Sequence, residues 1–161
     1  MKNLLFTAIC ILGMSLSSYA QEYESAIGAR LGSPLSLSYK KFVSESNAIE
    51  LYGGLGFGTG FSSFSANGAY LLHKPLDAAD GLSWYYGAGA GIAFFTFRST
   101  FLGSSGGATV NAQGYLGLDY KVSDIPLNLS IDIVPTFGVT GFRNGLFFGG
   151  AVAARYILGQ E

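Results

Sequence analysis

The only histidine of the chain, His73, is the residue to consider first for catalysis, because a Ser-His-acid arrangement needs an imidazole as its base. His73 stands directly before Lys74-Pro75 and a turn-forming segment, at the expected end of a strand. A histidine that makes a structural hydrogen bond in the interior or at the rim of a sheet is the simpler interpretation. We therefore predict no catalytic residues and no enzymatic activity.

Three other patterns suggest a ligand but have simpler explanations. The glycine runs at 54–56 and 87–91 are similar to phosphate-binding loops, yet neither opens a helix whose free amides would hold a phosphate. Asp119 and Asp132 are possible metal ligands, but we expect both to have cationic neighbours. Cys10 is the only cysteine and lies in the expected leader, so we predict no disulfide, no cofactor and no metal site.

A hairpin between residues 115 and 137 sets the pattern for the whole chain. Residues 115–122 alternate between apolar and polar, and the alternation restarts in residues 127–133 after the short segment Ser123-Asp124-Ile125-Pro126. Strand side chains point alternately to the two faces of a sheet. Each run is therefore expected to be a strand with one apolar face and one polar face.

The rest of the chain repeats this pattern in segments of about ten residues separated by turn-forming residues. We predict strands at 25–31, 35–42, 48–57, 64–73 and 82–97, then the two hairpin strands, and a last strand at 145–158. A Gly/Ser-rich loop is expected at 103–108. Eight alternating segments with short turns predict an all-β fold, an eight-stranded antiparallel up-and-down transmembrane β-barrel.

The composition and the N-terminus favour the membrane over water. The chain of 161 residues is 49% hydrophobic and only 12% charged, with a net charge of −1, so it has no basic surface for nucleic acid. Lys2, the apolar run at 4–16, and Ser18 and Ala20 at positions −3 and −1 predict a signal peptide at 1–20. Residues 21–161 are then a single barrel domain.

Assigning the apolar parity of each strand to the outside places six charged residues inside. These are Arg30, Lys40, Glu50, Asp119, Asp132 and Arg155. An eight-stranded barrel is just wide enough for its side chains to fill it, and buried charges must be paired. We predict a neutral, hydrogen-bonded network of three cations and three carboxylates that plugs the lumen.

Five aromatic residues of the outward parity are expected at the membrane interface, where barrels carry aromatic girdles. They are Tyr70, Trp84, Tyr86, Tyr120 and Tyr156. Pro135 is expected near a rim or at a bulge, because proline lacks the donor that a sheet ladder needs.

The chain resembles the small eight-stranded outer-membrane barrels of Gram-negative, Bacteroidetes-type bacteria, which are distantly OmpA/OmpX-like. The resemblance is carried by 117–121, 125–132 and 135–137, by 73–75 with 84–87, and by Arg155-Tyr156. It implies a cell outer membrane location, outer-membrane lipid and the barrel assembly machinery as partners, and a monomer. The chain departs from the family in having Leu158, where such barrels usually have an aromatic residue.

Three functional classes remain open. The preferred one is an integral outer-membrane protein with a plugged lumen and a structural or surface-interaction role. The others are a narrow, porin-like channel and a secreted, lipocalin-like soluble barrel that binds a small apolar ligand. On the side away from the termini, we expect short loops at 32–34, 58–63, 98–108 and 138–144.

Overall fold

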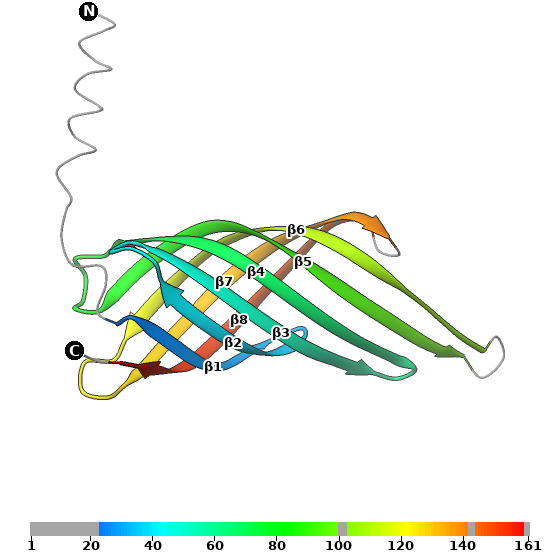
Figure 1. Ribbon diagram of the computed structural model, residues 1–161, viewed down its shortest axis with the longest axis horizontal. Coiled ribbons are helices and arrows are strands. Elements are labelled where there is room, and N and C mark those ends of the chain that lie inside the picture. The colour runs from blue at the N-terminus through cyan, green and yellow to red at the C-terminus, as the bar shows by residue number, and fades with distance from the viewer. Residues whose placement is uncertain (1–22, 100–102, 142–143, 160–161) are drawn as a thin grey trace, which may run out of the picture.

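Eight strands, each hydrogen-bonded to the next in sequence, form a closed antiparallel barrel in which β8 pairs with β1 (Figure 1). We describe residues 23–99, 103–141 and 144–159 of a computed structural model. The strands are β1 (Ser25–Gly32), β2 (Leu35–Phe42), β3 (Asn47–Gly58), β4 (Phe61–Pro75), β5 (Leu82–Ser99), β6 (Gly103–Lys121), β7 (Leu127–Gly141) and β8 (Gly145–Leu158). The predicted all-β, eight-stranded antiparallel barrel is confirmed. The expected signal peptide lies outside the described residues.

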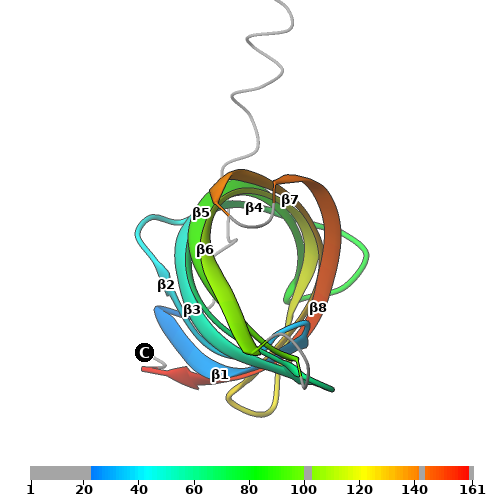
Figure 2. The same cartoon turned by 90° about the vertical axis from the view of Figure 1, so that its right-hand side faces the viewer.

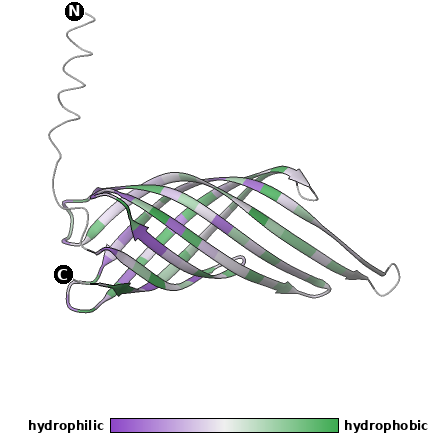
Figure 3. Ribbon diagram, in the orientation of Figure 1, coloured by the Kyte–Doolittle hydropathy of each residue, from purple (hydrophilic) through white to green (hydrophobic). Residues whose placement is uncertain are grey.

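The alternation of the sequence becomes the inside and the outside of the barrel. In β2, for example, exposed and buried residues alternate at every position. The same period of two produces the alternating bands of hydrophobic and hydrophilic residues along the strands in Figure 3. Across the sheet, inward residues lie opposite inward residues, as with Ser38 and Tyr52 or Asn128 and Arg155.

Three predicted loops are wrong because part of each is strand. Residues 103–108 are the first part of β6 and pair with β5, where Gly107 lies opposite Phe95 and Ser105 opposite Phe97. Residues 138–141 likewise extend β7. Residues 61–63 open β4, so the turn between β3 and β4 is only Thr59-Gly60, with Gly60 at φ 71. A sheet ladder is made by backbone groups and does not require that apolar and polar side chains alternate. Gly/Ser-rich sequence shows no such alternation, so these strand residues were predicted as loops.

The expectation for Pro135 is also wrong. It lies inside β7 opposite Phe148 of β8, and the register shift between β6 and β7 falls elsewhere, beside Val110 and Asn111. In the pairing of β7 with β6, Thr136 and Ile133 have partners, but Pro135 and Val134 between them are not paired. The ladder is interrupted where proline has no N–H to donate.

The two ends of the barrel differ. The first and last described residues, Tyr23 and Gly159, and the turns at 43–46, 76–81 and 122–126 lie at one end, which we call the terminal end (Figure 1). At the opposite, far end the wall has unequal height, because β1 and β2 have 8 residues each whereas β5 and β6 have 18 and 19. Figure 2 shows the barrel from the far end. No helix in the described part of the chain is long and apolar enough to cross a membrane.

Candidate functional site: the charged lumen

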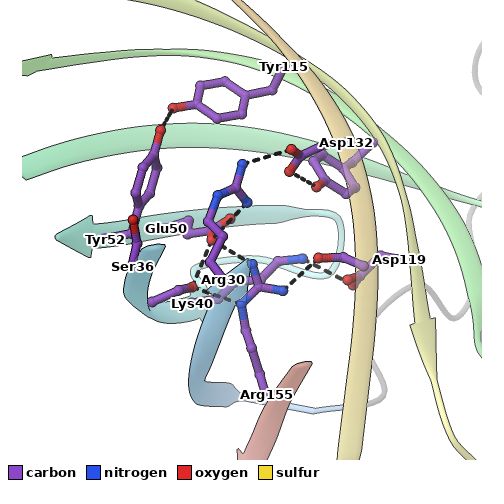
Figure 4. Close-up of polar contacts among 12 residues, drawn as sticks. Arg30, Ser36, Lys40, Glu50, Tyr52, Tyr115, Asp119, Asp132 and Arg155 are labelled. Atoms are coloured by element: carbon purple, nitrogen blue, oxygen red, sulfur yellow. Dashed lines mark hydrogen bonds and ion pairs between the residues drawn. The ribbon is translucent and has the colours of Figure 1, made fainter. Parts of the chain in front are cut away.

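The structure places all six predicted lumen charges inside the barrel. All six residues are at most 4% exposed: Arg30, Lys40, Glu50, Asp119, Asp132 and Arg155. They come from β1, β2, β3, β6, β7 and β8, and they meet across the lumen (Figure 4). Strand alternation therefore points each of them inward, and closure of the sheet brings them together.

Arg155 joins three walls of the barrel. Its Nη2 donates to Oε1 of Glu50 at 2.5 Å, and its Nε donates to the hydroxyl of Ser38 at 2.8 Å. Its Nη1 donates to Ser130 Oγ at 2.8 Å and to Asn128 Oδ1 at 3.2 Å. Because every nitrogen of the guanidinium has an acceptor, the buried cation is compensated in both charge and hydrogen bonding.

Arg30 makes the second ion pair. Its Nη2 is 2.7 Å from Asp132 Oδ1, and its Nη1 is 3.5 Å from the Glu50 oxygen that also binds Arg155. The other oxygen of Asp132 accepts a hydrogen bond from the Tyr85 hydroxyl at 2.6 Å. Glu50 therefore links the two guanidiniums, and Asp132 links Arg30 to β5.

Lys40 makes the third ion pair, across the lumen rather than with its neighbour in the sheet. Glu50 lies directly opposite Lys40 on β3, yet the Lys40 ammonium lies 3.0 Å from Asp119 Oδ2 on β6. Asp119 also accepts from Asn128 at 2.9 Å and from the Tyr23 hydroxyl at 3.1 Å. Three cations and three carboxylates thus form a set with no net charge.

A glycine makes room for one of these contacts. A side chain at Gly117 would begin 2.7 Å from the Tyr85 ring and 2.8 Å from Cβ of Asp132. Such distances are too short for a real Cβ, so the Tyr85–Asp132 hydrogen bond requires glycine at 117.

On the far side of the charges lies a layer of neutral polar groups. The hydroxyls of Tyr52 and Tyr115 are 2.7 Å apart, and the Tyr115 hydroxyl donates to Gln113 Oε1 at 2.7 Å. Gln113 in turn donates to Asn67 at 3.2 Å, and the Arg30 guanidinium lies 4.8 Å from the centre of the Tyr52 ring. This layer connects β3, β4 and β6 on the far side of the ion pairs.

On the terminal side the charges are covered by an apolar cluster. It contains the buried residues Tyr23, Ala26, Phe42, Ala48 and Ile157; Tyr23 precedes β1, and the other four lie near the terminal ends of their strands. The Tyr23 and Phe42 rings meet edge to face, with centroids 5.0 Å apart. From the terminal end, the lumen thus contains apolar groups, then ion pairs, then neutral polar groups.

His73 lies beside this cluster, near the terminal end of β4. Its ring stacks on Tyr85 at 5.0 Å and packs on Phe42 at 4.9 Å, and its Nε2 is 3.8 Å from Asp119 Oδ2. Neither ring nitrogen makes a hydrogen bond. The expected structural hydrogen bond of the His73 side chain is therefore not seen among the described residues, and no serine hydroxyl there is bound to the imidazole. Within the described residues, no group of three or more metal-ligating side chains is arranged to hold an ion.

The five predicted interfacial aromatics lie on the outward parity toward the terminal ends of their strands. Tyr70, Tyr86 and Tyr156 are 45%, 38% and 59% exposed. Trp84 and Tyr120 are half-buried. The rings of Trp84 and Tyr86 stack at 5.4 Å, and the Lys74 ammonium is 5.7 Å from the Trp84 ring.

Several residues of the network were not identified from the sequence. They are Tyr23, Ser38, Tyr52, Tyr85, Tyr115 and Ser130. The parity rule that placed the charges contains the signal for the strand residues, since Tyr52 shares a face with Glu50 and Tyr115 shares one with Asp119. Tyr23 precedes the first strand, so no alternation could assign it.

No known protein-family model and no curated protein sequence matches the chain. Two solved structures share its fold. One is the N-terminal β-barrel domain of Pseudomonas aeruginosa OprF, with a TM-score of 0.60 and 15% identity over 84% of this chain and 98% of that one. The other is Neisserial surface protein A, NspA, with a TM-score of 0.55 and 13% identity over 83% and 93%.

These structural neighbours are OmpA-like, eight-stranded outer-membrane barrels, and the chain shares their fold. At this level the resemblance seen in the sequence is confirmed. The narrower Bacteroidetes-type family stays a prediction, because identities of 15% and 13% establish a shared fold and nothing finer.

Proposed function

We propose that the chain is an integral outer-membrane β-barrel protein with a plugged lumen and a structural or surface-interaction role, and that it catalyses no reaction. The observation that carries this proposal is the inverted arrangement of polarity. Charged residues are sequestered along the axis, whereas large apolar side chains cover the outside, with Leu37 73%, Leu31 61% and Ile133 57% exposed. A soluble barrel that binds an apolar ligand needs the opposite arrangement.

The apolar exterior extends around the whole barrel, and every strand contributes to it. Its exposed members include Ile27, Leu37, Leu51, Tyr70, Ile92, Leu116, Ile131 and Val152, one from each of β1 to β8. Leaving such a surface in water costs roughly 25 cal/mol for each Å² of apolar area, so a lipid environment is strongly favoured. A closed barrel also leaves no unpaired sheet edge where lipid surrounds every strand.

Expression in a Gram-negative host tests the membrane location. We expect the mature chain in the outer-membrane fraction, resistant to extraction with sodium carbonate, with slower gel mobility after boiling than before. Recovery of the folded protein from the soluble periplasmic fraction would instead support the secreted barrel.

Conductance in planar bilayers tests the plugged lumen. The ion pairs and the layers on both sides of them fill the cross-section, so we expect no current steps above those of bare lipid. Reproducible single-channel steps from the wild-type barrel would refute the plug and support the narrow channel.

A further inference from the structure

The wall of the barrel is interrupted at the far end, on the side of β1 and β2. Pairing of β8 with β1 stops where Ala151 lies opposite Gly32, so residues 145–150 are paired only with β7. Pairing of β3 with β2 stops where Leu55 lies opposite Leu35, so residues 56–58 are paired only with β4. A gap in the wall lies between these two edges, on the far side of the turn Ser33-Pro34 (Figure 1). We call this gap the notch.

A cavity of about 360 Å³ lies in the far half of the lumen and reaches the notch. Its lining includes the turn Ser33-Pro34, Gly56 on one edge of the notch and Gly149 on the other. Phe57 and Phe148 also line it, although both point outward and are 79% and 78% exposed. Because residues on both edges of the notch line the cavity, the cavity extends to the notch.

The mouth of the cavity is aromatic. Phe61, Phe95 and Phe147 line it from inside, and the rings of Phe61 and Phe95 stack with centroids 6.0 Å apart. With Phe57 and Phe148 they form an aromatic surface that leads from the outer wall into the cavity. This route suits an apolar chain arriving from lipid rather than from water.

The floor of the cavity is polar but electrically neutral. Tyr52, Asn67 and Gln113 line it, and their hydroxyl and amide groups keep further hydrogen-bonding capacity beyond the bonds that they make to one another. Arg30 also lines it, but its guanidinium already binds Asp132 and Glu50. A charged ligand would find no free counter-ion there, whereas an uncharged polar group would find partners.

We propose that this cavity binds a small single-chain amphiphile with an uncharged hydrogen-bonding head, of the monoacylglycerol class, which enters from the bilayer through the notch. The head lies on the floor beside Tyr52, Asn67 and Gln113, and the chain leaves between the phenylalanines. The cavity of about 360 Å³ is near the lower limit of known ligand sites, so it has room for one chain and not two. The inference rests on the proposed membrane location.

Fluorescence quenching by brominated lipids tests this proposal. In a Trp84→Phe background, Phe95→Trp puts the only indole inside the cavity, and Phe94→Trp puts it on the outward face of the same strand. Each barrel is reconstituted with brominated monoacylglycerol or with brominated two-chain phosphatidylcholine. We expect both lipids to quench Phe94→Trp, and the monoacylglycerol to quench Phe95→Trp several-fold more than the two-chain lipid does.

A variant that fills the cavity tests the same proposal, and a variant with the same ring outside the cavity is its matched control. A Cβ at Gly149 would meet only the Val134 carbonyl, at 3.6 Å, so a side chain can start there without a clash, and Gly149→Phe puts a ring at the edge of the notch. Gly53→Phe adds the same ring on the outward parity of β3, where the nearest atom is the Ser65 carbonyl at 3.4 Å. We expect the first change to abolish the excess quenching of Phe95→Trp and the second to leave it unchanged.

Equal quenching of Phe95→Trp by the two lipids overturns the proposal, even if Gly149→Phe fails to fold. Persistence of the excess in a folded Gly149→Phe barrel overturns it as well. If neither lipid quenches Phe94→Trp, the barrel is not in the bilayer, and the proposed function fails together with this inference.

Discussion

At the residue scale, Arg155 is the central side chain of the charged network in the lumen. It is anchored on β8, and its guanidinium binds Ser38 on β2, Glu50 on β3, and Asn128 and Ser130 on β7. A single buried cation therefore ties four strands to one another across the lumen.

Replacing this arginine should destabilise the barrel strongly. In Arg155→Leu, Glu50 keeps the hydrogen bond from Ser38 at 2.7 Å, but its only remaining ion pair is the longer 3.5 Å contact with Arg30, so the charge of the carboxylate is poorly compensated. We expect a loss of about 3–5 kcal/mol in the free energy of unfolding. Urea titration in detergent micelles, followed by heat-modifiable gel mobility, measures it.

Two variants separate the network from a general effect of lost charge. Lys41→Leu removes an exposed ion pair, since the Lys41 and Glu24 side chains are 48% and 66% exposed, and should cost less than about 1 kcal/mol. Arg155→Leu combined with Glu50→Leu removes both members of the buried pair and should cost less than the sum of the single changes. Unfolding of Arg155→Leu at the wild-type urea concentration would refute the ion-pair assignment.

Tyr85 tests the contribution of a neutral donor to the same network. Its hydroxyl is buried and donates to Asp132 at 2.6 Å. Tyr85→Phe should cost about 1.5–3 kcal/mol, because a hydrogen bond to a charged group is lost. Tyr86→Phe, on the outward face, is the matched control and should leave the urea midpoint nearly unchanged. Equal midpoints for the two variants would contradict the contribution of Tyr85.

The sequence was sufficient to place the charges inside but not to pair them. Parity fixes the face of a residue, as it did for Lys40 and Asp119. The partner depends on strand tilt and on how far side chains reach across the lumen, and so Lys40 binds Asp119 on the opposite wall rather than the adjacent Glu50. Neither quantity is encoded in the alternation of one strand.

At the element scale, β7 carries the clearest division between the two environments. From Asn128 to Ile133, buried and exposed residues alternate without interruption, and Ile131 and Ile133 are 54% and 57% exposed. The inward members of the same segment bind Arg155 and Arg30.

A charge on the outward face of β7 should show where lipid lies. Ile131→Arg places a cation in the expected acyl region and should cost about 2–4 kcal/mol, as for arginine near the bilayer midplane. Val139→Arg, near the far end of the same strand, should cost only about 0–1 kcal/mol. Refolding into liposomes under urea measures both, and equal costs would contradict the assigned depth.

The limits of sequence-based prediction are also visible at this scale. The bounds of β2 and β8 were predicted correctly: alternation is regular along the whole of β2 and along the last half of β8. The first residues of β6 were mistaken for a loop, because Gly/Ser-rich sequence has no apolar face, although these residues pair with Phe95 and Phe97 of β5. The notch depends on unequal strand lengths and was therefore not predictable from periodicity.

At the scale of the whole molecule, three zones follow one another along the axis. An apolar cluster closes the terminal end, paired charges and neutral polar groups fill the middle, and the cavity and its notch occupy the far half. We propose that this order closes the barrel to ions and leaves it open to a ligand from one side. Both properties require that the outward apolar residues of each strand face lipid.

A spin-label scan along β7 tests that requirement most directly. Because Cys10 is the only cysteine and lies in the predicted leader, single cysteines at 128–133 can be labelled selectively in the bilayer-reconstituted barrel. We predict high collision rates with oxygen at Leu129, Ile131 and Ile133, and low rates at Asn128 and Ser130, with a period of two residues. High accessibility of the three apolar positions to a water-soluble nickel chelate, or the loss of this period, would contradict the account.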